Sequence, residues 1–259
     1  MRLPRPGSWV LIILVLAPRS AHAYRPFVST DASVADAGDI EVEFGYIGFR
    51  RDGSRTAIIA PTVIGNLGLG HDLEAVAEFK LVSDVSDGGT DDGTRFEDTA
   101  VSLKWVAHEG SLHDRGVVPS LAAELSLLVP TLPGEHSPGT ELVAIASGTA
   151  VGWTYHANAG VLVTPGADRT SPVWGLIVEH PVFGGLRAVA EVNGETATGT
   201  GADNSALVGA IWKLAAPAPI HELSLDVGLR HGISAAADEW GGTAGFTIAF
   251  PVWGEGDTR

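Results

Sequence analysis

The charge balance and the absence of Cys in this 259-residue chain exclude several classes of protein. It carries 31 acidic and 16 basic side chains, so we expect no nucleic acid partner. With no Cys, an exported fold must be stabilised by packing or by a continuous hydrogen-bond network instead of disulfides. After the first 23 residues, no stretch approaches 18 consecutive apolar residues, so no transmembrane helix is predicted. No cofactor is expected.

The first 23 residues have the layout of a secretory signal peptide. Two Arg precede a short apolar run, WVLIILVL (9–16), and Ala21-His22-Ala23 is a small-x-small cleavage site. We expect cleavage, with a mature chain that begins near Tyr24. Three Arg leave with the peptide, so 13 basic residues remain against 31 acidic ones, a net charge near −18.

From Asp39 onward, apolar and polar residues alternate with period 2. Residues 39–50 alternate Ile and Val with Glu, and residues 73–82 carry Leu, Ala and Phe on one face and charged residues on the other. Successive side chains of a strand point to opposite faces. Runs of about ten alternating residues match a tilted strand that crosses a bilayer. The apolar face is therefore expected to meet lipid and the charged face a wet interior.

The same alternation recurs along the chain. Clear segments lie at 98–107, 121–129, 153–161, 186–193, 222–230 and 244–250, and less regular ones at 55–65, 140–150, 172–180 and 204–213. The total is about twelve strands at roughly 20 residues each, too close for crossover helices. We predict an all-β fold: one up-and-down antiparallel transmembrane β-barrel over residues 39–253. Residues 24–38 would be a periplasmic lead-in and 254–259 a short tail.

The predicted connections alternate in length, which is typical of outer-membrane barrels. Long connections rich in Gly, Asp, Thr and Pro are expected at 84–95, 130–139, 164–172, 194–203 and 232–242, and shorter ones at 66–72, 181–185 and 214–220. The segment 108–119 departs from this rule because it is long. Aromatic residues on the apolar face suit interfacial girdles, although they would also fill a soluble core.

Three segments resemble the bacterial outer-membrane transporter family grouped with the MetA-pathway phenol-degradation proteins. They are RFEDTAVSLKWV (95–106), AEVNGET (190–196) and SALVGAIWKL (205–214). The resemblance implies a monomeric outer-membrane barrel that passes small organic molecules, and it brings no catalytic residues. One departure is that outer-membrane barrels commonly end on an aromatic residue, whereas here GEGDTR follows Trp253.

The polar face of the strands supplies the candidate residues of a lumen or substrate pathway. They are Glu41, Glu43, Glu74, Glu78, Lys80, Lys104, Glu124, His156, Asn158, Arg187, Glu191, Asn193, Glu222, Asp226 and Arg230. Acidic residues outnumber basic ones, which predicts a preference for cations and neutral polar solutes over anions if water fills the lumen. If Val76, Leu128, Leu162 and Val189 form a dry patch, a small aromatic molecule would enter instead. In a third reading these charges only form ladders that hold the barrel's shape.

Two motifs invite comparison with enzymes. HEGSLH (108–113) places its two His five apart in a Gly-containing connection, which does not fit the zinc-protease spacing of four on a helix. His156 and Asn158 share one face, as in outer-membrane phospholipases with twelve strands, but no serine lies beside them in the sequence. We therefore predict that the protein is not an enzyme.

The acidic loop DVSDGGTDDG (84–93) is a weak candidate for a metal site. Its carboxylates are Asp84, Asp87, Asp91 and Asp92. Their spacing does not match the EF-hand pattern, so a solvated loop is favoured and no metal is predicted.

The leading hypothesis is an outer-membrane channel for passive passage of small organic molecules in a Gram-negative envelope. Its expected partners are outer-membrane lipid, those small molecules and the outer-membrane assembly machinery. The alternatives are a structural or binding barrel with a plugged lumen, an outer-membrane lipid hydrolase, and a soluble periplasmic sandwich. A hydrolase is disfavoured because the sequence shows no nucleophile.

Overall fold

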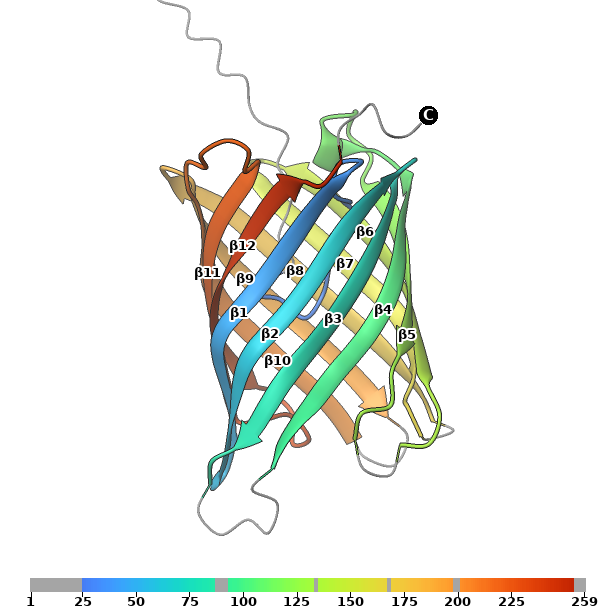
Figure 1. The fold of residues 1–259 in the computed structure, drawn as a ribbon, viewed down its shortest axis with the longest axis vertical. Coiled ribbons are helices and arrows are strands. Elements are labelled where there is room, and N and C mark those ends of the chain that lie inside the picture. The colour runs from blue at the N-terminus through green and yellow to red at the C-terminus, as the bar shows by residue number, and fades with distance from the viewer. Residues whose placement is uncertain (1–24, 87–92, 133–134, 167–168, 198–200, 254–259) are drawn as a thin grey trace, which may run out of the picture.

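The computed structural model describes residues 25–86, 93–132, 135–166, 169–197 and 201–253. Twelve antiparallel strands form a closed barrel in which each strand pairs with its neighbours in sequence and β1 pairs with β12 (Figure 1). This confirms the predicted fold class and strand number. The predicted signal peptide (1–23) and tail (254–259) lie outside the described residues. Within the described residues, no helix is long and apolar enough to cross a membrane.

The barrel runs from Asp39 to Pro251, close to the predicted bounds. Its strands are β1 Asp39–Asp52, β2 Arg55–Gly70, β3 Leu73–Asp84, β4 Thr94–His108, β5 Ser120–Leu128, β6 Gly139–Ala150, β7 Trp153–Val163, β8 Thr170–Phe183, β9 Leu186–Ala197, β10 Gly201–Lys213, β11 Glu222–Gly232 and β12 Trp240–Pro251. A short 3-10 turn, η1 (Ser111–His113), lies between β4 and β5.

The two ends of the barrel are distinct. Asp39, the first residue of β1, pairs with Pro251, the last residue of β12, so the barrel begins and ends at the same rim. We call this rim the terminal end and the opposite rim the loop end. The turns β2–β3, β6–β7 and β8–β9 at the terminal end leave only two residues outside the strands. Residues 85–86 after β3 and 129–132 after β5 lie at the loop end (Figure 1), whereas the long β4–β5 connection, 109–119, lies at the terminal end. Of the predicted long loop 194–203, residues 194–197 and 201–203 are strand.

The outer surface of the barrel is apolar. In β4, Val101, Leu103 and Trp105 are about half exposed, whereas the intervening Lys104 is completely buried. In β3, Glu74 is buried and Ala77 is exposed, as the alternation predicted. A closed sheet leaves no unpaired edge, which is the condition for a sheet to lie in lipid. The apolar outer face and the polar interior fit a β-barrel of the outer membrane.

Two bulges shift the faces that simple alternation would assign. The register of β1 slips between Gly45 and Ile47, so Tyr46 and Ile47 are both exposed and Arg50 then reaches the buried Glu97. In β4, Asp98 has a φ of 47°, beside a slip in the β3–β4 register. A bulge adds one residue to one strand, so a pattern of period 2 changes face there.

The N-terminal residues 25–38 lie inside the barrel (Figure 1). We call them the inner segment. The sequence predicted a periplasmic lead-in over residues 24–38. Instead, Ala32 is fully buried and packs with Val106, Ala122 and Ile145, which point inward from β4, β5 and β6. The inner segment then leaves the interior at the terminal end, where Gly38 leads into β1.

Candidate functional site: a charged lumen filled by the inner segment

All fifteen predicted lumen residues are buried or half-buried in the barrel. The nine that are at most 9% exposed are Glu41, Glu43, Glu74, Lys104, His156, Asn158, Glu191, Glu222 and Asp226. The six that are half-buried are Glu78, Lys80, Glu124, Arg187, Asn193 and Arg230. Burial and mutual contacts bring these side chains together in the interior. That they line a substrate pathway stays a prediction.

Opposite charges pair across neighbouring strands in the interior. Lys104 of β4 stands opposite Glu74 of β3 and Glu124 of β5, so the three side chains form one row. Arg230 of β11 donates to Ser205 of the neighbouring β10 at 2.7 Å and reaches across β10 to donate to Glu191 of β9 at 2.6 Å. Such cross-strand pairs stabilise a sheet, which supports part of the structural interpretation of these charges.

Wall side chains accept hydrogen bonds from six backbone N–H groups of the inner segment. The donors are Arg25, Val28, Ser29, Thr30, Ala32 and Ala35. The acceptors are Glu43 of β1, Glu191 of β9, Asn158 of β7, Ser147 of β6 and Glu74 of β3. Buried backbone donors need partners, and here the lumen side chains take the place of a sheet neighbour. The lumen is therefore matched to this segment around most of its circumference.

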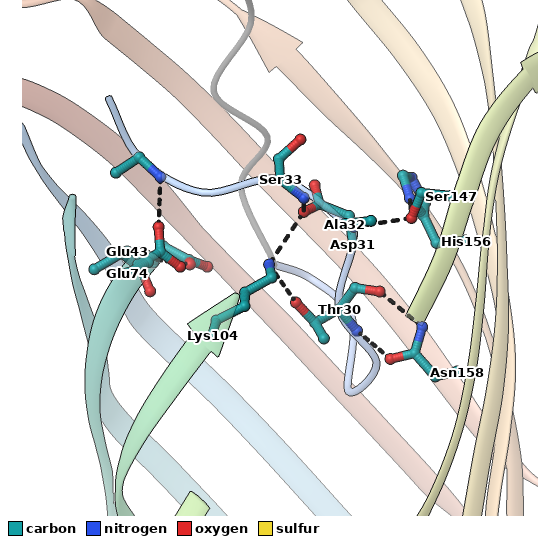
Figure 2. A network of polar contacts seen from close by, with 12 residues as sticks. Thr30, Asp31, Ala32, Ser33, Glu43, Glu74, Lys104, Ser147, His156 and Asn158 are labelled. Atoms are coloured by element: carbon teal, nitrogen blue, oxygen red, sulfur yellow. Dashed lines mark hydrogen bonds and ion pairs between the residues drawn. The ribbon is translucent and has the colours of Figure 1, made fainter. Parts of the chain in front are cut away.

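The middle of the inner segment contacts wall side chains of several strands (Figure 2). The amide of Asn158 donates to the Thr30 carbonyl at 2.7 Å and its oxygen accepts from the Thr30 N–H at 3.0 Å. Lys104 Nζ lies 3.3 Å from Asp31 Oδ1. Asp31 also accepts from the Ser33 N–H at 2.8 Å, which closes a tight turn. These contacts hold the turn against β4 and β7.

Glycines on the inner face of the wall make room for the inner segment. A Cβ added at Gly175 would lie 1.8 Å from Ser29 Oγ, and one at Gly68 would lie 2.0 Å from the Asp36 carbonyl oxygen. At Gly228 it would lie 3.0 Å from Pro26. Glycine inside a strand often marks a close approach of another backbone. The wall sequence is thus adapted to an occupied interior at several separate positions.

Sequence reasoning missed a serine beside His156. Ser147 of β6 lies opposite His156 of β7, with Oγ 2.9 Å from Nδ1, and His156 Nε2 lies 3.1 Å from Glu179 Oε1. The two-residue turn 151–152 fixes this register, so the pairing of Ser147 with His156 was readable from the hairpin. Our reason for disfavouring a hydrolase, the lack of a nearby serine, was therefore wrong.

The environment of this Ser–His–Glu group is nevertheless closed. Ser147 is fully buried, and its Oγ accepts the Ala32 N–H at 2.9 Å. Glu179 also pairs with Arg187 at 2.9 Å. A nucleophile needs access for a substrate carbonyl, and here the inner segment occupies that position. The absence of enzyme activity stays a prediction.

A second group of charges, in which the sequence had singled out only Lys80 and Asp84, lies at the loop end. Arg50 donates to both oxygens of Glu97 at 2.8 Å, and Arg95 donates to Glu97 at 2.7 Å and also pairs with Asp84. Lys80 pairs with Asp98 at 2.6 Å. These opposite charges neutralise one another, so the group joins β1, β3 and β4 near the rim.

No group of three possible metal ligands occurs among the described residues. Asp87, Asp91 and Asp92 of the acidic loop lie outside them. Of the predicted dry patch, Val189 is buried and packs with Leu207, Ile211 and Phe27 of the inner segment. This apolar cluster is therefore formed by residues of β9, β10 and the inner segment.

No family model and no curated relative matches the chain. Among solved structures it is similar to an outer membrane channel from Pseudomonas putida, with a TM-score of 0.56 and 14% identity over 85% of this chain and 96% of that chain. It is also similar to the translocator domain of the autotransporter NalP from Neisseria meningitidis, with a TM-score of 0.45 and 14% identity over 83% and 89%. At this identity, the first match shows a shared outer-membrane barrel fold. The resemblance to the phenol-degradation family stays a prediction.

Proposed function

We propose that this outer-membrane barrel is a channel for passive passage of small organic molecules, and that the inner segment closes it in the described state. The observation that carries the proposal is the charged interior, with Glu41, Glu43, Glu74 and Lys104 almost fully buried behind an apolar outer face. Buried charge costs free energy unless it is paired. An interior kept for shape alone would be less costly if it were apolar.

The inner segment is held in a way that permits release. It is fixed to the wall by hydrogen bonds from its backbone N–H groups to wall side chains, each worth about 1 kcal/mol net for a neutral acceptor and about 1.5–3 kcal/mol for a carboxylate. It does not belong to the strand ladder, so its departure breaks no strand pairing. A cavity of about 310 Å³ beside the β8–β9 turn, lined in part by Arg187, Lys213 and Glu222, supports access from the terminal end.

A disulfide lock tests this proposal. Ser29 Cβ lies 2.9 Å from the position of a Cβ on Gly175, so the inner segment must shift by only about 1 Å for the two Cβ atoms to reach the roughly 3.5–4.5 Å of a disulfide. The natural chain has no Cys, so Ser29→Cys/Gly175→Cys would tie the inner segment to β8 without competing thiols. The matched control is Ser102→Cys/Ser126→Cys, whose hydroxyls lie 2.8 Å apart on paired strands β4 and β5 away from the inner segment.

The measurement is uptake of a neutral aromatic, a small cation and a small anion into liposomes, before and after reduction. We expect the oxidised lock to abolish uptake and reduction to restore it, with no redox effect in the control. Uptake that is equal in the oxidised and reduced lock would show that the inner segment is not the gate.

The second candidate is a structural or binding barrel with a plugged lumen. The fully buried Ala32 and the six backbone hydrogen bonds to the wall favour it. In that case, no solute would enter liposomes faster with the reduced lock than with empty liposomes. The same experiment therefore separates the two functions.

A further inference from the structure

The first described residue, Arg25, occupies a side-chain pocket in the barrel wall. Its side chain is 6% exposed, and its guanidinium faces Asp226 of β11, with Nε 3.4 Å from Oδ2 and Nη2 3.4 Å from Oδ1. Nη2 also donates to the hydroxyl of Thr243 in β12. The backbone N–H of Arg25 donates to Glu43 of β1 at 2.9 Å. Three adjacent strands thus contribute to one site.

Two wall glycines shape this pocket for a flat group. A Cβ at Gly45 of β1 would lie 2.5 Å from Arg25 Nη1, and one at Gly245 of β12 would lie 2.8 Å from Nε. Gly45 and Gly245 are register partners, so the guanidinium lies against backbone on both strands. Any larger residue at either position would exclude it.

The pocket has acceptor capacity that Arg25 does not use fully. Asp226 is 3% exposed, and its Oδ1 accepts no hydrogen bond from the described residues. Charge-assisted hydrogen bonds between Arg and carboxylate are usually about 2.7–2.9 Å long. Both contacts between Arg25 and Asp226 are 3.4 Å long, so Asp226 can accept shorter hydrogen bonds than those that Arg25 donates.

We propose that this pocket is a binding site for guanidinium or primary ammonium groups of small molecules, and that Arg25 occupies it as a tethered competitor. The inference rests on the proposed channel function and names its substrate class: small organic cations rich in N–H donors. Glu43, whose carboxylate accepts the Arg25 N–H, adds negative charge beside the pocket, and negative charge concentrates cations in the lumen. A free guanidinium can approach Asp226 more closely than Arg25 does.

The test begins with Arg25→Ala, which empties the pocket in the full chain. The probe is methylguanidinium, titrated calorimetrically into the purified barrel in detergent. We expect binding with a dissociation constant of about 1 mM. Tetramethylammonium has the same charge without N–H donors and should bind at least tenfold more weakly. Arg51→Ala is the matched control, because the Arg51 guanidinium lies outside this pocket and donates to the Gly53 carbonyl.

A second variant tests whether methylguanidinium binds in this pocket. Arg25→Ala/Asp226→Asn should lose methylguanidinium binding by at least tenfold, because the carboxylate is its main partner. A slower-migrating band after heating on a gel, which we also expect for the natural protein, would show that each variant is a closed barrel. Arg25→Gln replaces Arg25→Ala if the latter does not fold. Equal binding of the two cations, or binding unaffected by Asp226→Asn, would overturn the proposed site.

Single-channel recording separates this inference from the channel proposal. If the Arg25→Ala variant conducts ions and methylguanidinium blocks that current, both the channel and the binding site are supported. Conductance without methylguanidinium binding would overturn the site and leave the channel. Binding without conductance or uptake in any variant would overturn the channel and leave a binding barrel.

Discussion

Lys104 of the barrel wall and Asp31 of the inner segment form an ion pair in the interior, with Nζ 3.3 Å from Oδ1. Their side chains are 0% and 7% exposed. Lys104 also stands between Glu74 and Glu124 on the neighbouring strands. It is therefore the cation around which three carboxylates of the wall and the segment are arranged. This arrangement makes Lys104 a structural link between the barrel and its occupant.

Replacement of Lys104 should be strongly destabilising. Lys104→Met leaves buried carboxylates without their cation, and breaking a buried pair costs about 3–5 kcal/mol. The free energy of unfolding is measured by urea titration in lipid vesicles. The control is Lys80→Gln, because Lys80 and Asp98 are 34% and 60% exposed and an exposed pair is worth about 1 kcal/mol or less. Similar losses in both variants would contradict the assigned role of Lys104.

The two faces of β3 can be tested at adjacent positions. Ala77 is exposed on the outer face, so Ala77→Arg should cost about 2–4 kcal/mol in the membrane. Glu78 points inward, and Glu78→Gln keeps its size and polarity, so the cost should be smaller. Refolding titrations in vesicles measure both. Equal destabilisation would show that the assignment of faces is wrong.

Gly175→Val should displace the inner segment without opening the barrel. A Cβ there would lie 1.8 Å from Ser29 Oγ, so the segment must move away from β8. We expect higher single-channel conductance than in the natural protein. Gly65→Val is the control, because the nearest atom to a Cβ at Gly65 lies 4.0 Å away. An unchanged conductance in a correctly folded Gly175→Val would argue against closure by this segment.

The group of Ser147, His156 and Glu179 should hold the inner segment and not act as a hydrolase. Ser147→Ala removes the acceptor for the Ala32 N–H, so conductance should rise modestly. Hydrolysis of short-chain nitrophenyl esters should be absent from both proteins. Labelling of Ser147 by a fluorophosphonate in the natural protein, lost in Ser147→Ala, would instead reveal an activated serine.

The purified protein should behave as a closed membrane barrel. Exposed Trp105, Leu103 and Val101 form part of its apolar outer face, so it should require detergent. It should migrate differently on a gel before and after boiling, because the hydrogen-bonded cylinder resists detergent until heated. Recovery as a soluble monomer without detergent would contradict the assignment to the membrane.

The fold was predictable because the alternation of apolar and polar residues along each strand indicates which face meets lipid and which meets the interior. Leu73, Glu74 and Ala77 show it clearly, and their assignment was correct. The bulge after Gly45 was not predictable, because it changes the face of Arg50 without changing its residue type. A pattern in sequence therefore identifies strands more reliably than it identifies the face of every residue.

The interior could be predicted as a set of residues but not as a site. Residues 25–38 show no alternation, and their partners Glu43, Asn158 and Glu191 are scattered over three strands. Nothing local in the sequence indicates that a segment before the first strand folds into the lumen. Inward glycines such as Gly175 and Gly228 are the available signal, since they mark where a strand must accept another backbone.

The pairing of β1 with β12 has a consequence for biogenesis. Asp39 and Pro251 lie at opposite ends of the barrel sequence yet are neighbours in the sheet, so the seam cannot form until the whole chain has been exported. Until then both terminal strands present unpaired edges, which favour aggregation, and contacts so distant in sequence form slowly. A nascent chain of this kind must be shielded during transit, and truncation before β12 would leave an open sheet that no membrane accommodates.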